Sequence, residues 1–177
     1  MRNVCRFAVG ALVMWLVTAC VSRSGPDVLP VSAQPPSVSP VPGECDTSDI
    51  RVAGSPTEAP EVTVPRDCAT PTTLLVRDLV RGDGAQAVTG TDLDVSYVLV
   101  LWNAGTVLDT TWYAGESLPS PVRDLGHGKL VRGWDKGLPG IREGGRRLIV
   151  VPPIQDGGES DSAALVYVVD AVSVTPG

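Results

Sequence analysis

The feature that most constrains this 177-residue chain is an alternation over residues 93–102, in which every second side chain from Leu93 on is apolar or aromatic. A period of two is that of a β-strand with one buried face. The segment therefore predicts a strand with Tyr97 pointing into a core or a cavity. The positions on the apolar face are Leu93, Val95, Tyr97, Leu99 and Leu101.

Four further segments predict strands of the same domain. Residues 74–80, 147–151 and 164–174 are rich in aliphatic and β-branched side chains, and 107–109 follows a tight turn as a short return strand. One short helix of about two turns fits residues 132–139, where a Leu-Pro-Gly sequence stops it. We expect an α+β fold, an antiparallel sheet of about five strands curved around one short helix.

A tryptophan flanked by glycines stands at the start of the expected helix. Gly133 and Gly137 allow close backbone approach or a positive φ, and the indole of Trp134 offers a broad, rigid apolar surface. These residues alone leave two interpretations open. Trp134 forms the floor of a binding pocket, or it only fills a core, as most tryptophans do.

The first nineteen residues have the order of a secretory signal. Arg2 and Arg6 precede an apolar run, 7–19, which at about thirteen residues is too short to cross a bilayer core of roughly 30 Å. The Val-Thr-Ala-Cys sequence that ends at Cys20 resembles the lipobox of bacterial lipoproteins, which implies lipidation of that cysteine. We therefore expect a lipid-anchored protein on the extracytoplasmic side of the cell membrane. An ordinary signal peptide with a chance cysteine is the alternative.

Residues 20–43 predict a tether. Prolines recur through this segment, which favours extended polyproline II at about 3.1 Å per residue and cannot bury a core. Nothing in an acidic domain behind a polar linker indicates association, so we expect a monomer.

Residues 44–72 predict an N-terminal extension closed by a disulfide. Cys45 and Cys68 are the two thiols that remain after the signal and the lipid site, and an exported chain enters an oxidising compartment. Metal ligation is the weaker alternative, because His127 is the one histidine of the chain and a zinc site takes four ligands. We expect His127 to be an exposed turn residue between two glycines.

The formal charge of −6 argues against a nucleic-acid partner. The one basic cluster is Arg142, Arg146 and Arg147, diluted by Glu143 and next to an apolar run. We expect this cluster to be a solvated sheet edge.

Five motifs in a fixed order resemble the FKBP-type peptidyl-prolyl isomerase domain, over residues 73–177. A Gly-Asp-Gly turn at 82–84 precedes the strand of Tyr97, and Leu108-Asp109-Thr110-Thr111 stands where the family has aromatic-Asp-Ser-Ser. Residues 130–134 match Val-Ile-x-Gly-Trp, and 164–167 match the last part of Ala-Thr-Leu-Val-Phe with tyrosine for phenylalanine. The lipoprotein-like start and Pro-rich tether resemble envelope members of the family from actinobacteria.

The resemblance implies catalysis of prolyl bond rotation without a nucleophile, a cofactor or a metal. It assigns an apolar cup for the proline ring, with Trp134 as the floor and Asp109 at the rim, and a ligand-binding backbone amide to Leu130. The expected partners are proline-containing segments of secreted or envelope proteins. The residues implied to line the cup are Tyr97, Leu108, Asp109, Val131, Trp134 and Tyr167.

Two departures from the family pattern leave a second function open. Where the family has Pro-Glu-Leu-Ala-Tyr-Gly this chain reads Pro-Ile-Gln-Asp-Gly-Gly at 153–158, so the pocket tyrosine is missing, and the flap that follows is cut to 159–163. Loss of the tyrosine removes a hydrogen-bond donor to the substrate carbonyl. The shorter flap gives less shielding from water. The alternative is an FKBP-fold peptide-binding or chaperone-like module with weak or no isomerase activity.

Overall fold

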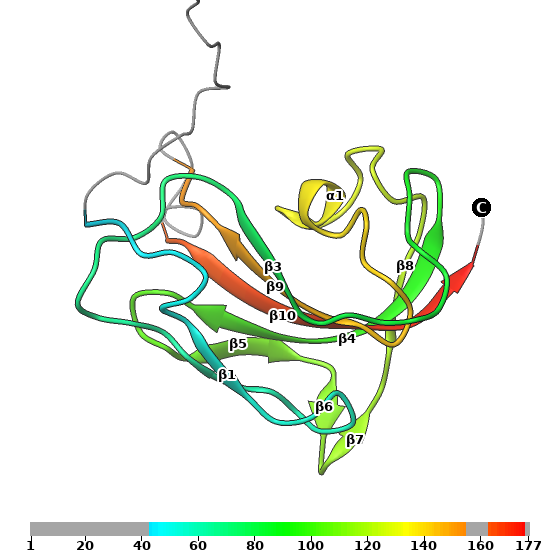
Figure 1. The fold of residues 1–177 in the computed structure, drawn as a ribbon, viewed down its shortest axis with the longest axis horizontal. Helices are drawn as coiled ribbons and strands as arrows, with labels where there is room; N and C mark the ends of the chain where they lie inside the picture. The colour runs from blue at the N-terminus through cyan, green and yellow to red at the C-terminus, as the bar shows by residue number, and fades with distance from the viewer. Residues whose placement is uncertain (1–42, 155–162, 176–177) are drawn as a thin grey trace, which may run out of the picture. The chain divides into compact units, whose positions relative to one another are not determined.

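The computed structural model describes residues 43–154 and 163–175, which build an antiparallel six-stranded sheet beside one short helix (Figure 1). The strand order is β3-β9-β10-β4-β5, and β8 also pairs with β4. Two small hairpins, β1–β2 and β6–β7, lie outside this sheet. The elements are β1 (Arg51–Ala53), β2 (Glu61–Thr63), β3 (Leu75–Val80), β4 (Asp92–Leu101), β5 (Val107–Thr110), β6 (Trp112–Tyr113), β7 (Glu116–Ser117), β8 (Ser120–Val122), α1 (Trp134–Gly137), β9 (Arg146–Val151) and β10 (Leu165–Thr175).

The predicted α+β class with about five strands is wrong. The regular secondary structure of the described residues is almost entirely β, and α1 is a single turn of four residues rather than the expected two turns. The helix stays short because Gly133, its N-cap, has a φ of 89° and Pro139 follows Leu138 at its C-terminus. Strand β8, which the sequence pattern did not reveal, contains Pro121 and pairs with only one neighbour.

The concave face of the sheet carries the first core, which α1 and its flanking loops cover (Figure 1). The alternation along β4 sends Leu93 and Val95 to this side, where both are buried. Trp134 and Tyr167 belong to the same core, and Tyr97 packs against it. No helix among the described residues has the length and apolar character of a membrane span.

The convex face carries a second core, which the segment before β3 covers. Ile50 and Val64 of this extension pack with Val98 and Val166 of the sheet, and Ile50 is 1% exposed. Every residue of β9 is therefore buried, on whichever face its side chain lies. An antiparallel sheet with two covered faces needs apolar residues on both, which explains the unbroken run Leu148-Ile149-Val150-Val151.

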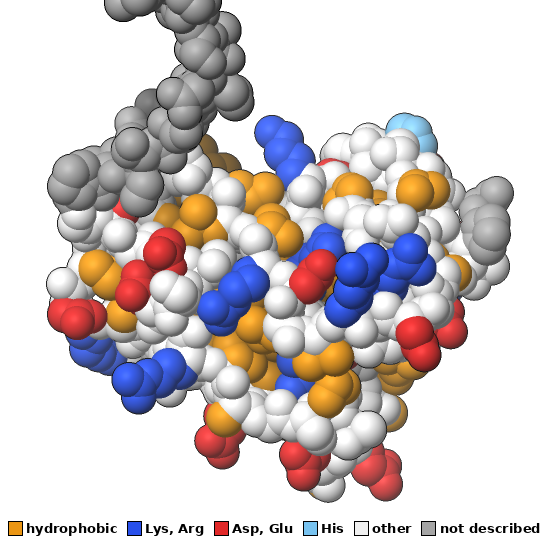
Figure 2. All heavy atoms as spheres, viewed as in Figure 1, with side chains coloured by type: hydrophobic (Ala, Val, Ile, Leu, Met, Phe, Trp, Pro, Cys, Tyr) orange, Lys and Arg blue, Asp and Glu red, His pale blue; other side chains and the backbone are white. Residues whose placement is uncertain are grey.

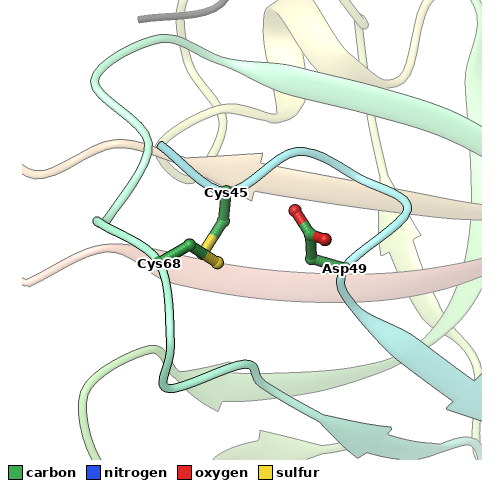
Figure 3. A group of neighbouring side chains, drawn as sticks. All are labelled: Cys45, Asp49 and Cys68. Carbon is green, nitrogen blue, oxygen red and sulfur yellow. A yellow bond between two sulfur atoms is a disulfide. The ribbon is translucent and has the colours of Figure 1, made fainter. Parts of the chain in front are cut away.

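A disulfide joins Cys45 to Cys68 and closes the extension into a loop (Figure 3). Backbone bonds from Cys45 N to Ala69 O at 2.9 Å, and from Ala69 N to Gly43 O at 2.6 Å, hold the same two segments together. Asp49 lies beside the two sulfurs, and its carboxylate accepts from the amide of Asp46 at 2.8 Å. Sulfurs that are bonded to each other are not the thiolates that a metal binds, so this group is a structural cross-link.

The expected solvated edge of Arg142, Arg146 and Arg147 is also wrong, because Arg146 is 1% exposed and Arg147 is 6% exposed. Arg146 forms a bidentate ion pair with Asp170 on the convex face, at 2.6 and 2.8 Å, and donates to the carbonyls of Gly54 and Glu58. Burial raises the pKa of Asp170, and the guanidinium opposes that rise. The pair thus fixes the β1–β2 loop to the sheet.

The double variant Cys45→Ala/Cys68→Ala should lose about 3 kcal/mol of unfolding free energy, because the cross-link restricts the unfolded chain across a separation of 23 residues. Urea unfolding followed by tryptophan fluorescence measures this loss. Activity on a short peptide should be unchanged, since the extension covers the face opposite α1. An unchanged unfolding midpoint would show that the extension is held by its apolar contacts and the Arg146–Asp170 pair alone.

Candidate functional site

Three aromatic rings meet under α1 on the concave side of the sheet. The ring centroids of Tyr97 and Trp134 are 5.3 Å apart, those of Trp134 and Tyr167 5.7 Å, and those of Tyr97 and Tyr167 6.4 Å. Two of the three pairs are edge-to-face, an arrangement that aromatic quadrupoles favour. Trp134 and Tyr167 are 6% and 4% exposed. The structure thus brings together three of the residues that the sequence placed in the cup.

Asp109 closes one side of this cluster from β5. Its carboxylate accepts a hydrogen bond of 2.5 Å from the Tyr97 hydroxyl, and its other oxygen accepts from the Thr110 amide at 2.8 Å. Burial, with the hydrogen bond and negative charge of Asp109, raises the pKa of Tyr97 far above its ordinary range. The Tyr97 hydroxyl therefore stays protonated and keeps Asp109 oriented at the rim.

Gly133 decides where Trp134 lies. The backbone at Gly133 has a φ of 89°, and a Cβ added there would come within 2.3 Å of Val151 Cγ2. Gly137 is similarly close to β9, since its Cβ would lie 2.8 Å from Ile149 Cγ2. Glycine at these two positions lets the one-turn helix rest directly on the sheet, with the indole turned into the core.

Two charged residues that sequence reasoning did not place in the site hold α1 from its two ends. Asp135 accepts from the amides of Gly126 at 2.8 Å and Leu130 at 3.3 Å, which orders the loop before the helix. Arg147 donates from Nη1 to the carbonyls of Gly137, Leu138 and Pro139 at 2.9–3.1 Å. Asp135 had a signal in the sequence, an acid in the first turn of the expected helix. Arg147 had none, because it reaches α1 from β9.

Leu108 and Val131, which the resemblance assigned to the cup, are 51% and 52% exposed, so neither forms a buried wall. The amide of Leu130, which the resemblance assigned to ligand binding, already donates to Asp135. Within the described residues the neighbouring amide of Val131 has no hydrogen-bond partner. The open backbone donor at the mouth is therefore one residue further along the chain than expected.

The residues of the cup offer hydrogen-bond donors and apolar surface, not a general acid or base. The indole Nε1 of Trp134 is buried without a partner, and the Tyr167 hydroxyl has no partner among the described residues. Burial raises the pKa of Tyr167, so this hydroxyl also stays a donor. His127 is half-exposed and its Nδ1 contacts the Asp124 carboxylate at 2.5 Å.

The predicted erosion of the flap lies largely outside the described residues. Of the stretch 154–163, the structure describes Ile154, which is 43% exposed, and Ala163, whose carbonyl accepts from Arg132 at 2.9 Å. Cys20, the signal segment 1–19 and the tether up to residue 42 lie outside them as well.

An aromatic cup with backbone and hydroxyl donors at its mouth is the kind of site that binds a proline ring and its amide, which defines the class of a prolyl isomerase. The comparisons agree. The model of the FKBP-type peptidyl-prolyl cis-trans isomerase family matches residues 84–171. A probable FK506-binding protein of Corynebacterium glutamicum is 32% identical over 122 residues, which cover 66% of this chain and 98% of that protein.

An FK506-binding protein of Streptomyces anulatus is 33% identical over 125 residues, covering 66% of this chain and 98% of the relative. Among solved structures, FkpA from Escherichia coli aligns with a TM-score of 0.49 and 27% identity, covering 59% of this chain and 49% of that one. The chain belongs to the FKBP family and is an FKBP-type peptidyl-prolyl cis-trans isomerase.

A matched pair of glycine variants tests how the cup is built. Gly133 and Gly128 both have positive φ, but an added Cβ meets Val151 only at Gly133 and meets nothing within 4 Å at Gly128. Gly133→Ala should therefore be less stable than Gly128→Ala by about 1–3 kcal/mol of overpacking, with kcat/KM lower by about tenfold or more. Thermal unfolding and a peptide isomerisation assay measure both. Equal losses in the two variants would contradict the proposed contact between α1 and β9.

Proposed function

We propose that this protein is a membrane-tethered isomerase that assists the folding of secreted or envelope proteins on the extracytoplasmic side. The observation that carries the proposal is the aromatic cup of Tyr97, Trp134 and Tyr167 with Asp109 at its rim. The disulfide of the extension supports an oxidising compartment, where such cross-links persist. The lipobox-like sequence before Cys20 and the Pro-rich segment 20–43 support a lipid anchor and a tether.

Rotation of a prolyl bond needs no nucleophile, because its barrier of about 18–20 kcal/mol comes from amide resonance. A site accelerates the rotation by binding the twisted amide better than either planar form. In this cup Trp134 and Tyr97 would pack on the proline ring and exclude water, which weakens the resonance form that carries separated charge. The amide of Val131 would bind a substrate carbonyl at the mouth.

Tyr167 would add a second donor. Its side chain is 4% exposed, it faces the other two rings, and its hydroxyl has no partner among the described residues. A bound substrate carbonyl would accept a hydrogen bond from this hydroxyl, worth about 0.5–1.5 kcal/mol in net terms. A phenylalanine, which the resemblance gives as the family's residue at this position, could not donate. This tyrosine would therefore take over part of the role of the flap tyrosine that the family pattern has and this sequence lacks.

The protein at catalytic concentration should accelerate proline-limited refolding of an unfolded protein. Tyr167→Phe should lower kcat/KM about tenfold while leaving the unfolding free energy unchanged, because the hydroxyl bonds to no described residue of the fold. Tyr113→Phe, an exposed position, is the matched control and should change neither quantity. Trp134→Ala and Asp109→Ala should abolish most of the acceleration.

The same assay separates the isomerase from the peptide-binding alternative. An unchanged refolding rate together with measurable binding of a proline-containing peptide would favour a holding module. A loss of stability in Tyr167→Phe would mean that the hydroxyl serves the fold, which contradicts its role as a donor to substrate.

The anchor is tested separately in bacterial cells that process lipoproteins. The full chain should incorporate a labelled fatty acid and fractionate with membranes, and Cys20→Ala should lose both, since a thiol is the site of attachment. Cys5→Ala, inside the signal segment, is the control and should keep the label. Incorporation that persists in Cys20→Ala would contradict the lipobox interpretation.

A further inference from the structure

A second cleft lies on the edge of the molecule where β3 ends and the loop between α1 and β9 passes. Its volume is about 270 Å³, below the range of roughly 300–1,000 Å³ that drug-sized ligands occupy. Figure 2 shows arginine and lysine side chains gathered around an acidic group over this part of the molecule. The residues that line the cleft are Asp78, Val80, Arg81, Gly82, Gln86, Gly140 and Arg142.

The cleft is positive in a protein whose net charge is −6. Its one lining acid, Asp78, is paired with Arg147 Nε at 2.5 Å, so these two charges compensate each other. Arg81 and Arg142 then remain as two guanidinium groups without an opposing carboxylate in the lining. Arg142 donates from Nη1 to the Gly84 carbonyl at 3.0 Å, which fixes its side chain but does not neutralise it.

The neighbouring acids face other partners. The Glu143 carboxylate accepts from the amide of Val174 at 3.0 Å, and an Asp83 carboxylate oxygen lies near Gly144. Beneath the cleft, Arg147 is 6% exposed and lies under Gly140, where a Cβ would already be 3.8 Å from Nη2. Gln86 donates to the Gly140 carbonyl at 3.3 Å from the same side. Arg142, Gln86 and Arg147 are thus held in place by hydrogen bonds around the hollow, while Arg81 is an exposed residue of its lining.

We infer that this cleft binds a phosphate group. Arginine forks match the geometry of oxyanions and form charge-assisted hydrogen bonds with them. Arg81, Arg142 and Gln86 line a space of headgroup size. The site is distinct from the prolyl cup and shares no lining residue with it. A free phosphate and a phospholipid headgroup are the two sources of this chemistry.

Titration of the folded protein with inorganic phosphate, at constant ionic strength set by chloride, tests the inference by amide chemical shifts. The shifts should concentrate at 80–86 and 140–142, and Arg81→Gln and Arg142→Gln should each weaken binding about tenfold or more. Arg51→Gln, an exposed arginine outside the cleft, is the control and should bind as the wild type does. Peptide isomerisation should be unchanged in all three variants.

Vesicles of phosphatidylglycerol and of phosphatidylcholine distinguish the sources. Phosphate binding with the expected variant dependence establishes a free phosphate as ligand. Binding only to phosphatidylglycerol vesicles, with the same dependence on Arg81 and Arg142, establishes the headgroup. Phosphate shifts spread over all surface arginines, equal effects of Arg51→Gln and Arg81→Gln, or no binding in either arm would overturn the inference.

Discussion

The fold depends on two adjacent arginines of β9 that point to opposite faces of one sheet. Because successive side chains of a strand alternate, Arg146 reaches the convex face and Arg147 the concave face. Each is buried and pairs with an aspartate of a neighbouring strand. Each also donates hydrogen bonds to backbone carbonyls of the segment that covers its face. Burying a charge is costly unless it is paired in this way. One dipeptide thus ties both layers to the sheet.

The geometry of the prolyl cup depends on the contacts that Arg147 makes on the concave face. A helix of one turn has too few internal bonds to hold itself, so α1 takes its position from Arg147 at its C-terminal end, Asp135 at its start and the close approach at Gly133. The indole of Trp134 is consequently fixed before a substrate arrives. A site that acts by desolvation and placement, rather than by proton transfer, depends on such preorganisation.

Local patterns in the sequence predicted β4 and the neighbourhood of Trp134 because both are set by short-range rules, a period of two and the steric needs of glycine. The roles of Arg146 and Arg147 were not predictable, since they depend on which carboxylates and carbonyls the fold brings to them. The sequence of an arginine cluster is the same whether its side chains are solvated or one of them is buried against Asp170. The Leu130 amide was misassigned for the same reason, because its bond to Asp135 belongs to the loop.

The convex layer contains the first described residues of the domain. The chain that leads to Gly43 joins this layer, where Gly43 and Cys45 bond to Ala69 and the disulfide closes the same loop. The cup lies on the other face, separated from this junction by the sheet itself. Displacement of the preceding segment would therefore be resisted by the cross-linked extension and the Arg146–Asp170 pair before it reached Trp134. Under the tethering proposed above, attachment and catalysis would therefore use opposite faces of the sheet.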